Sequence, residues 1–161
     1  MEPRIEISPE MKIIGKRLTM SLAKNRIVEL WKSFMPFRSQ ITCNITDDLL
    51  SVSVYQPNYF ENFSPSNEFQ KWAAVQVDYF DNIPTNLDSL TLPKGQYAVF
   101  DHRGLSTDNS IFQYIFTEWL PASQYALDNR PHFEILGDMY KHNDPNSEEE
   151  LWIPIKAKAH N

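Results

Sequence analysis

Residues 30–36 read LWKSFMP, and residues 115–121 read IFTEWLP. Both stretches follow one pattern: an apolar residue, an aromatic one, two further residues, a second aromatic, a second apolar residue and a proline. A proline moves the residue before it out of the α region, so the helix that begins near Ile27 is predicted to end at about Pro36. Two matching helix ends in one chain indicate an internal duplication.

The segments around the first copy have the patterns of a small mixed unit. A β-rich segment precedes the helix, and two segments that suit half-buried strands follow it. The predicted elements are a strand over 11–20, a helix over 27–37, and strands over 50–55 and 69–77.

The second half repeats this order after a turn-rich linker over 81–95. HFEIL at 132–136 matches SVSVY at 51–55, and LWIPI at 151–155 matches AAVQV at 73–77. An unrelated α+β chain can also give this order twice by chance, but the shared helix end favours duplication. The predicted elements are a strand over 96–100, a helix over 111–120, and the two strands at 132–136 and 151–155.

We therefore predict an α+β fold made of duplicated β-α-β-β units with pseudo-twofold symmetry. One half alone would leave its apolar face exposed to water, so we expect the two halves to pair and bury both faces. The predicted architecture is a curved antiparallel sheet with two main helices and a central ligand cleft. It forms a single domain over 1–161, with internal repeats at about 10–80 and 93–157.

The composition argues against several classes of protein. Hydrophobic residues make up 42% of the 161 residues, and no apolar run approaches the roughly 20 residues of a membrane helix, so we expect no membrane partner. The net charge is −6 with scattered basic residues, and we expect no direct binding of nucleic acid. The N-terminus lacks a signal-peptide pattern, which favours the cytoplasm. Cys43 is the single cysteine, no zinc-ligand spacing occurs, and we expect no metal and no cofactor.

Six stretches carry a resemblance to a known family: GKRLTMSLAKN (15–25), YQPNYF (55–60), FQKWAAVQV (69–77), LPKGQYAVFDHRG (92–104), YIFTEWLPASQYALDNRPHFEILG (114–137) and NDPNSEEELWIPIK (143–156). The chain resembles the GyrI-like small-molecule-binding domain, also called the integron-associated or AraC effector-binding domain. The resemblance runs from about Ile13 to Lys156.

This resemblance implies a duplicated β-α-β-β fold and a central aromatic pocket that accepts hydrophobic, often cationic, compounds. Family members occur as C-terminal domains of regulators, as stand-alone proteins, as a DNA gyrase inhibitor, and as hydrolases of cyclopropane-bearing toxins. Fewer than fifteen residues precede the first predicted strand, so we expect a stand-alone binding domain without a helix-turn-helix module.

Glu134 is the candidate acidic residue of the pocket, because it matches the family's pocket glutamate after the RPxF motif. In an apolar cleft its carboxylate would favour a ligand cation, or would be protonated without one. The alternative is a glutamate on the solvent side of an alternating strand.

Aromatic side chains would complete such a pocket by stacking and by cation–π attraction. Thirteen per cent of the chain is aromatic, more than a core of this size requires. Each candidate can equally be an ordinary core residue; Trp119 and Tyr55 are preferred because they lie on elements that face the family's cleft. The candidates are Trp31, Phe34, Tyr55, Trp72, Phe100, Tyr114, Trp119 and Trp152.

Three function classes stay open from the sequence. The first is binding of hydrophobic small molecules, cationic ones included, in a cleft between the two repeats, for sensing or sequestration linked to transcription regulation. The second is a protein-interaction module with a protein partner, such as a gyrase inhibitor or a regulator accessory protein. The third is a hydrolase in which Glu134, with a tyrosine or His132, transfers protons, although no GxSxG or other catalytic motif supports it. The acidic run at 144–150 lacks calcium-loop spacing and is interpreted as a solvated turn.

Overall fold

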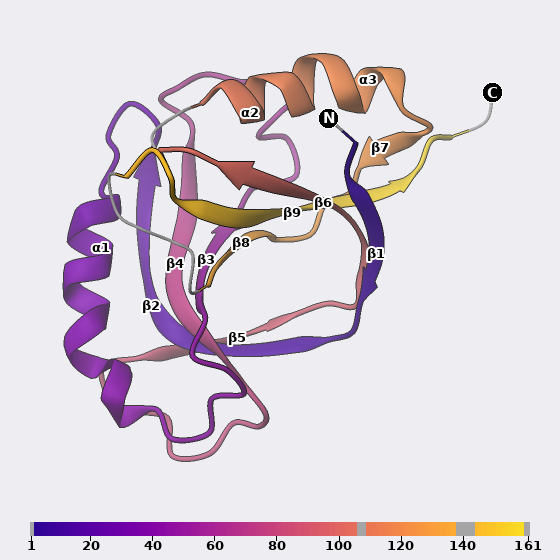
Figure 1. The fold of residues 1–161 in the computed structure, drawn as a ribbon. Helices are drawn as coiled ribbons and strands as arrows, with labels where there is room; N and C mark the ends of the chain where they lie inside the picture. The colour runs from indigo at the N-terminus through magenta and orange to yellow at the C-terminus, as the bar shows by residue number, and fades with distance from the viewer. Residues whose placement is uncertain (1, 106–108, 138–143, 160–161) are drawn as a thin grey trace.

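The computed structural model describes residues 2–105, 109–137 and 144–159, and Figure 1 shows its ribbon. The first half contains four strands and one helix, which runs on into a 3-10 turn, η1 (Met35–Gln40). These elements are β1 (Arg4–Ser8), β2 (Met11–Ser21), α1 (Ile27–Phe34), β3 (Leu49–Val54) and β4 (Glu68–Val77).

The second half contains the same kinds of element, but its helix is built differently. A short α-helix, a π-helical turn and a final α-turn form one continuous helical segment, which covers the top of the molecule in Figure 1. The elements are β5 (Asp88–Leu92), β6 (Gly95–Arg103), α2 (Ser110–Tyr114), η2 (Ile115–Trp119), α3 (Leu120–Ala122), β7 (Tyr125–Leu127), β8 (His132–Leu136) and β9 (Glu148–Ala157).

The strands of the described residues form one curved antiparallel sheet in the order β1-β6-β9-β8-β3-β4-β2-β5, with β7 added beside β9. This order reads the same from both ends when β1 is matched to β5, β2 to β6, β3 to β8 and β4 to β9. The pseudo-twofold axis therefore passes between β3 and β8. The predicted α+β class with duplicated units is confirmed.

Each half gives its first strand to the other half. β1 precedes β2 in the chain but pairs with β6, and β5 precedes β6 but pairs with β2. The prediction of a turn-rich linker over 81–95 was wrong for Asp88–Leu92, which form β5. β1 and β7 were also not predicted. All three strands are short and lie at a border of the sheet, where few positions need an apolar side chain.

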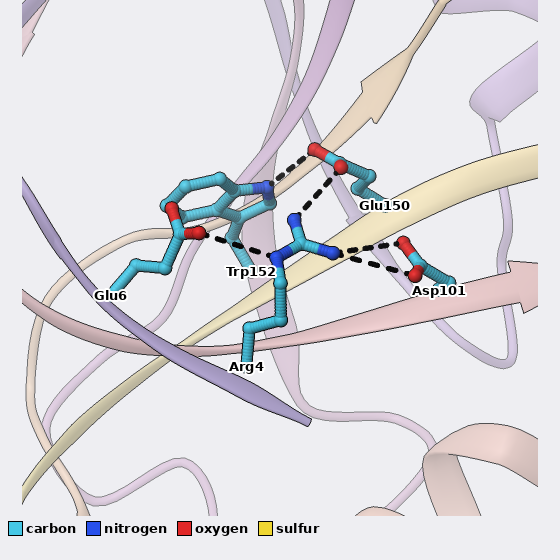
Figure 2. A network of polar contacts seen from close by, with 5 residues as sticks. All are labelled: Arg4, Glu6, Asp101, Glu150 and Trp152. Atoms are coloured by element: carbon cyan, nitrogen blue, oxygen red, sulfur yellow. Dashed lines mark hydrogen bonds and ion pairs between the residues drawn. The ribbon is translucent and has the colours of Figure 1, made fainter. Parts of the chain in front are cut away.

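A polar network fixes β1 in its place beside the second half (Figure 2). The Arg4 guanidinium donates to Glu150 at 2.9 Å, to Glu6 at 3.2 Å and to Asp101 at 3.4 Å, and Trp152 Nε1 donates to Glu150 at 3.2 Å. The Arg4 side chain is 45% exposed, and exposed ion pairs contribute about 1 kcal/mol at most. The network therefore sets the register of β1 more than it stabilises the fold.

The two faces of the sheet bury different cores. On one face α1 covers a cluster around Phe34 and Val75, and the α2–α3 segment covers a second cluster around Phe100 and Ile115. The opposite face has a third cluster that joins both halves, with Val52 and Trp72 from the first and Tyr97 and Phe133 from the second. On the helix-covered face, the two apolar clusters are therefore separated from each other at the pseudo-twofold axis.

Candidate functional site

Polar residues lie between the two apolar clusters on the helix-covered face of the sheet. Ser51 pairs with Glu134 and Ser53 pairs with His132 across the β3–β8 junction, so these side chains lie on one face of the sheet. Ser53, His132 and Glu134 border a cavity of about 30 Å³, which is enough for about one water molecule. The cavity is lined by Ser53, Tyr55, Phe112, Phe116, His132, Phe133, Glu134, Leu151 and Ile153.

A stack of aromatic rings lies beside the cavity and joins the two halves. Phe60, from the segment after β3, stacks on Phe116 of η2 with ring centroids 5.2 Å apart. Phe60 also stacks on His132 at 5.7 Å, and Tyr55 contacts Phe60 edge-on at 4.9 Å and His132 at 4.8 Å. The Phe60 ring therefore packs between residues of the two halves.

Burial keeps His132 and Tyr55 uncharged. Removal from water is the main reason that the pKa of His132 falls from 6.5 to about 3, and the positive charges of Lys71 and Arg130 add to the effect. Burial likewise raises the pKa of the Tyr55 hydroxyl far above its ordinary value. Proton transfer by either group at neutral pH would need a pKa much nearer 7. Both rings serve here as neutral aromatic walls.

Two glutamates lie together beside this wall. Glu149 is 8% exposed, and burial, the charge of Glu134 and a hydrogen bond with Glu134 raise the pKa of Glu149 from 4.5 to about 8. At neutral pH Glu149 therefore keeps its proton. Glu149 Oε2 is buried and makes no hydrogen bond within the described part of the chain.

Lys71 of β4 completes the polar cluster. Its ammonium donates to Ser53 Oγ at 2.8 Å and lies 3.9 Å from Glu134 Oε1, and its side chain is 12% exposed. We call Lys71, Glu134 and Glu149 the charge cluster. It combines one cation, one carboxylate and one carboxylic acid beside an aromatic cavity.

The sequence analysis identified only part of this site. Lys71 was missed, although it is in phase with the buried Ala73 and Val75 on β4, a position that an alternating strand keeps for its inner face. Glu149 was missed because the acidic run was taken for a solvated turn. That interpretation was wrong for Glu148–Glu150, which begin β9, and it is Glu149 that points inward.

Two of the nine predicted pocket residues, Glu134 and Tyr55, line the cavity together. The other seven pack elsewhere: Trp31 lies edge-on to Phe34 beneath α1, and Trp119 lies edge-on to Phe100 beneath the second helical segment, where Tyr114 also packs. Trp72 and Trp152 belong to the cluster on the opposite face.

The aromatic walls that the sequence analysis missed come from the second helix and the segment after β3. Phe112 and Phe116 are four residues apart, which places them on one helix face, and this spacing was visible in the sequence. Phe60 ends the quoted YQPNYF segment but had no periodic pattern around it.

A second hollow lies away from the axis, between η1 and β4. It measures about 380 Å³ and is more open, and its lining includes Met35, Arg38 and Ile41. No group of three or more metal-ligating side chains occurs among the described residues. None of the helices in that part of the chain has the length and apolar character needed to span a bilayer.

A duplicated sheet with an aromatic cavity on its pseudo-twofold axis defines the class of effector-binding domains. The chain belongs to the family of integron-associated effector binding proteins, whose model matches residues 4–155. The family resemblance seen in the sequence is thereby confirmed. No curated protein matches the chain.

Solved structures share this fold at low sequence identity. SAV2435 bound to tetraphenylphosphonium is 18% identical with a TM-score of 0.70, covering 97% of this chain and 94% of that one. An integron cassette protein from Vibrio cholerae is 14% identical with a TM-score of 0.63, covering 96% of each chain. EcmrR in a complex with DNA is 14% identical with a TM-score of 0.72, and the match covers 98% of this chain but 58% of EcmrR. The chain thus spans less than two thirds of the length of EcmrR.

Proposed function

We propose that this chain binds a hydrophobic, aromatic small molecule in the cavity between its halves, for sensing or sequestration linked to transcription regulation. The observation that carries the proposal is the position of the cavity. Aromatic rings from both halves meet there over buried polar groups, the combination typical of small-molecule sites. Family membership and the ligand bound to SAV2435 support the same class of function.

Binding requires the aromatic stack to open. Ligand pockets usually measure about 300–1,000 Å³, whereas this cavity holds about 30 Å³. Phe60 is the movable part, because it lies on a segment outside the strands, while Phe116 and His132 are held by a helix and a strand. A compound that takes the place of the Phe60 ring would stack between Phe116 and His132.

A thermal-shift screen of lipophilic cations and uncharged aromatic compounds tests the proposal. The wild type is compared with Glu134→Gln, which changes the cavity, and with Glu118→Gln, an exposed control on the second helical segment. Compounds that bind should raise the melting temperature of the wild type and of the control by the same amount. In Glu134→Gln the rise in melting temperature should differ in size. No shift with any compound would contradict the proposal and favour a protein-interaction module.

A hydrolase is the second candidate, because the charge cluster contains an acid and a base side by side. Protonated Glu149 could donate a proton and ionised Glu134 could accept one, with a pKa near 8 suited to the donor. The same screen separates this candidate, since a hydrolase consumes its compound. Glu134→Gln would then lower the rate without lowering the affinity. A cytoplasmic location and the absence of direct DNA contact stay predictions.

A further inference from the structure

A cation of the protein's own lies beside the cavity, in contact with two residues that line it. Lys71 Nζ lies 3.9 Å from Glu134 Oε1, the carboxylate that a cationic ligand would approach, and Ser53 fixes the ammonium at 2.8 Å. The Lys71 side chain is 12% exposed and that of Glu134 is 23% exposed, so water screens this pair poorly.

Apolar packing does not account for a lysine at this place. The hydrogen bond from Ile45 N–H to the Gln76 carbonyl is repeated in the second half by the one from Asp128 N–H to the Pro154 carbonyl, so Gln76 of β4 corresponds to Pro154 of β9. The pseudo-twofold axis therefore relates Lys71 to Glu149, and both halves place a titratable residue at this position. Burial of a charge is costly, so packing does not explain Lys71.

The charge cluster sums to zero at neutral pH. Lys71 carries one positive charge and Glu134 one negative charge, while Glu149 keeps its proton because its pKa is raised to about 8. The other titratable residues that line the cavity, His132 and Tyr55, are also uncharged. A cation that entered would find its carboxylate taken and would meet the like charge of Lys71.

We propose that Lys71 is the specificity-determining residue of the cavity, an internal counter-ion that makes it accept uncharged aromatic compounds and disfavour lipophilic cations. The inference rests on the proposed function and names the ligand class of the same site. An uncharged ligand leaves the Lys71–Glu134 pair intact, whereas a cation must displace the ammonium or remove the proton from Glu149. Both alternatives weaken cation binding.

Isothermal titration at pH 7 with two probes of similar shape tests this inference: tetraphenylphosphonium, a cation, and triphenylphosphine oxide, which is uncharged. The wild type should bind the uncharged probe more tightly than the cation. Lys71→Met keeps the aliphatic stem but removes the charge, and it should bind the cation at least tenfold more tightly than the wild type does. Its affinity for the uncharged probe should change by less than threefold.

Three further variants separate charge from packing. Lys71→Arg keeps the charge and should keep the wild-type preference, and Lys32→Met removes an exposed charge on α1 and should change nothing. Adding Glu134→Gln to Lys71→Met should abolish the gain in cation affinity, because the free carboxylate is then gone.

Tighter binding of tetraphenylphosphonium than of triphenylphosphine oxide by the wild type would overturn the inference without any variant. An unchanged or weakened cation affinity in Lys71→Met would overturn it as well. Absence of binding by both probes in every variant would instead count against the proposed function, and the inference would fall with it.

Discussion

Glu149 is held in an environment that opposes its charged form. The side chain is on the helix-covered face of β9, and Glu134, Lys71 and the buried His102 are the titratable groups beside it. Burial of the Glu149 carboxyl and the nearby charge of Glu134 oppose ionisation of Glu149 more strongly than Lys71 favours it. The pKa of Glu149 therefore rises from 4.5 to about 8. The folded protein therefore binds a proton that the unfolded chain releases at a lower pH.

This linkage predicts how stability changes with pH. The contribution of Glu149 is fully present below pH 4.5 and is lost as the pH rises through about 8, because the unfolded state binds fewer protons there. Glu149→Gln should therefore raise the free energy of unfolding above pH 8, by about 2 kcal/mol, and should remove most of the slope between pH 6.5 and 8. Urea unfolding followed by circular dichroism measures both quantities.

The pH window of this experiment avoids the opposite effect of His132. The pKa of His132 is lowered from 6.5 to about 3, so its contribution is present above pH 6.5 and is lost as the pH falls below that value. Glu148→Gln is the control, because its carboxylate is 44% exposed beside Arg103. Equal slopes in the wild type and Glu149→Gln above pH 6.5 would show that Glu149 is ionised in the folded protein.

The site residues differ in how far the sequence could reveal them. Glu134 follows the family's RPxF motif, and Tyr55 lies on an element that faces the family's cleft, so the resemblance was enough to name both. Lys71 and Glu149 are charged residues in strands, and an alternating pattern does not say which face is covered until the helices are placed. Lys71 and Glu149, which set the charge beside the cavity, could therefore be recognised only from the structure.

At the scale of elements, the segment after β3 and the π-turn of the second helix provide two of the rings that meet beside the cavity. The wider turn over Ile115–Trp119 carries Phe116, and the Phe60 ring stacks against it from the other half. π-helical turns are rare and often occur at functional sites. These two elements together form the contact that a ligand must break.

Removal of the Phe60 ring is expected to speed up binding. Phe60→Ala deletes a half-buried ring, so the free energy of unfolding should fall by about 1–2 kcal/mol. Triphenylphosphine oxide should associate at least several-fold faster, because no ring has to leave first; stopped-flow tryptophan fluorescence measures this rate. Phe63→Ala is the matched control, since its ring is in the same segment, contacts Tyr59 and is 53% exposed. Equal association rates in Phe60→Ala and the wild type would show that Phe60 does not limit entry.

The long periodic elements could be predicted from the sequence, and the short border strands could not. β2, β3, β4, β6, β8, β9 and both helical segments lie where apolar periodicity placed them. In β5, by contrast, only Leu90 and Leu92 alternate with polar residues and only Leu92 is buried, so the pattern is too short to indicate a strand. The π-turn was also invisible, because its residues fit an ordinary α-helical spacing.

At the scale of the whole molecule, duplication explains where the site lies. The palindromic strand order puts β3 beside β8 at the centre, and the two helical segments cover the sheet on either side of that junction. The matching LWKSFMP and IFTEWLP stretches were enough to predict the duplication. The exchange of β1 and β5 between halves was not predictable, because a local pattern does not record which distant strand a segment pairs with.

The structure of the protein with triphenylphosphine oxide bound is the measurement that tests the central conclusion most directly. We expect the compound over the β3–β8 junction, between Phe116 and His132, with the Phe60 ring displaced and Lys71 still beside Glu134. A compound bound instead in the hollow between η1 and β4, with the Phe60–Phe116 stack intact, would contradict the assignment of the cavity between the halves as the effector site.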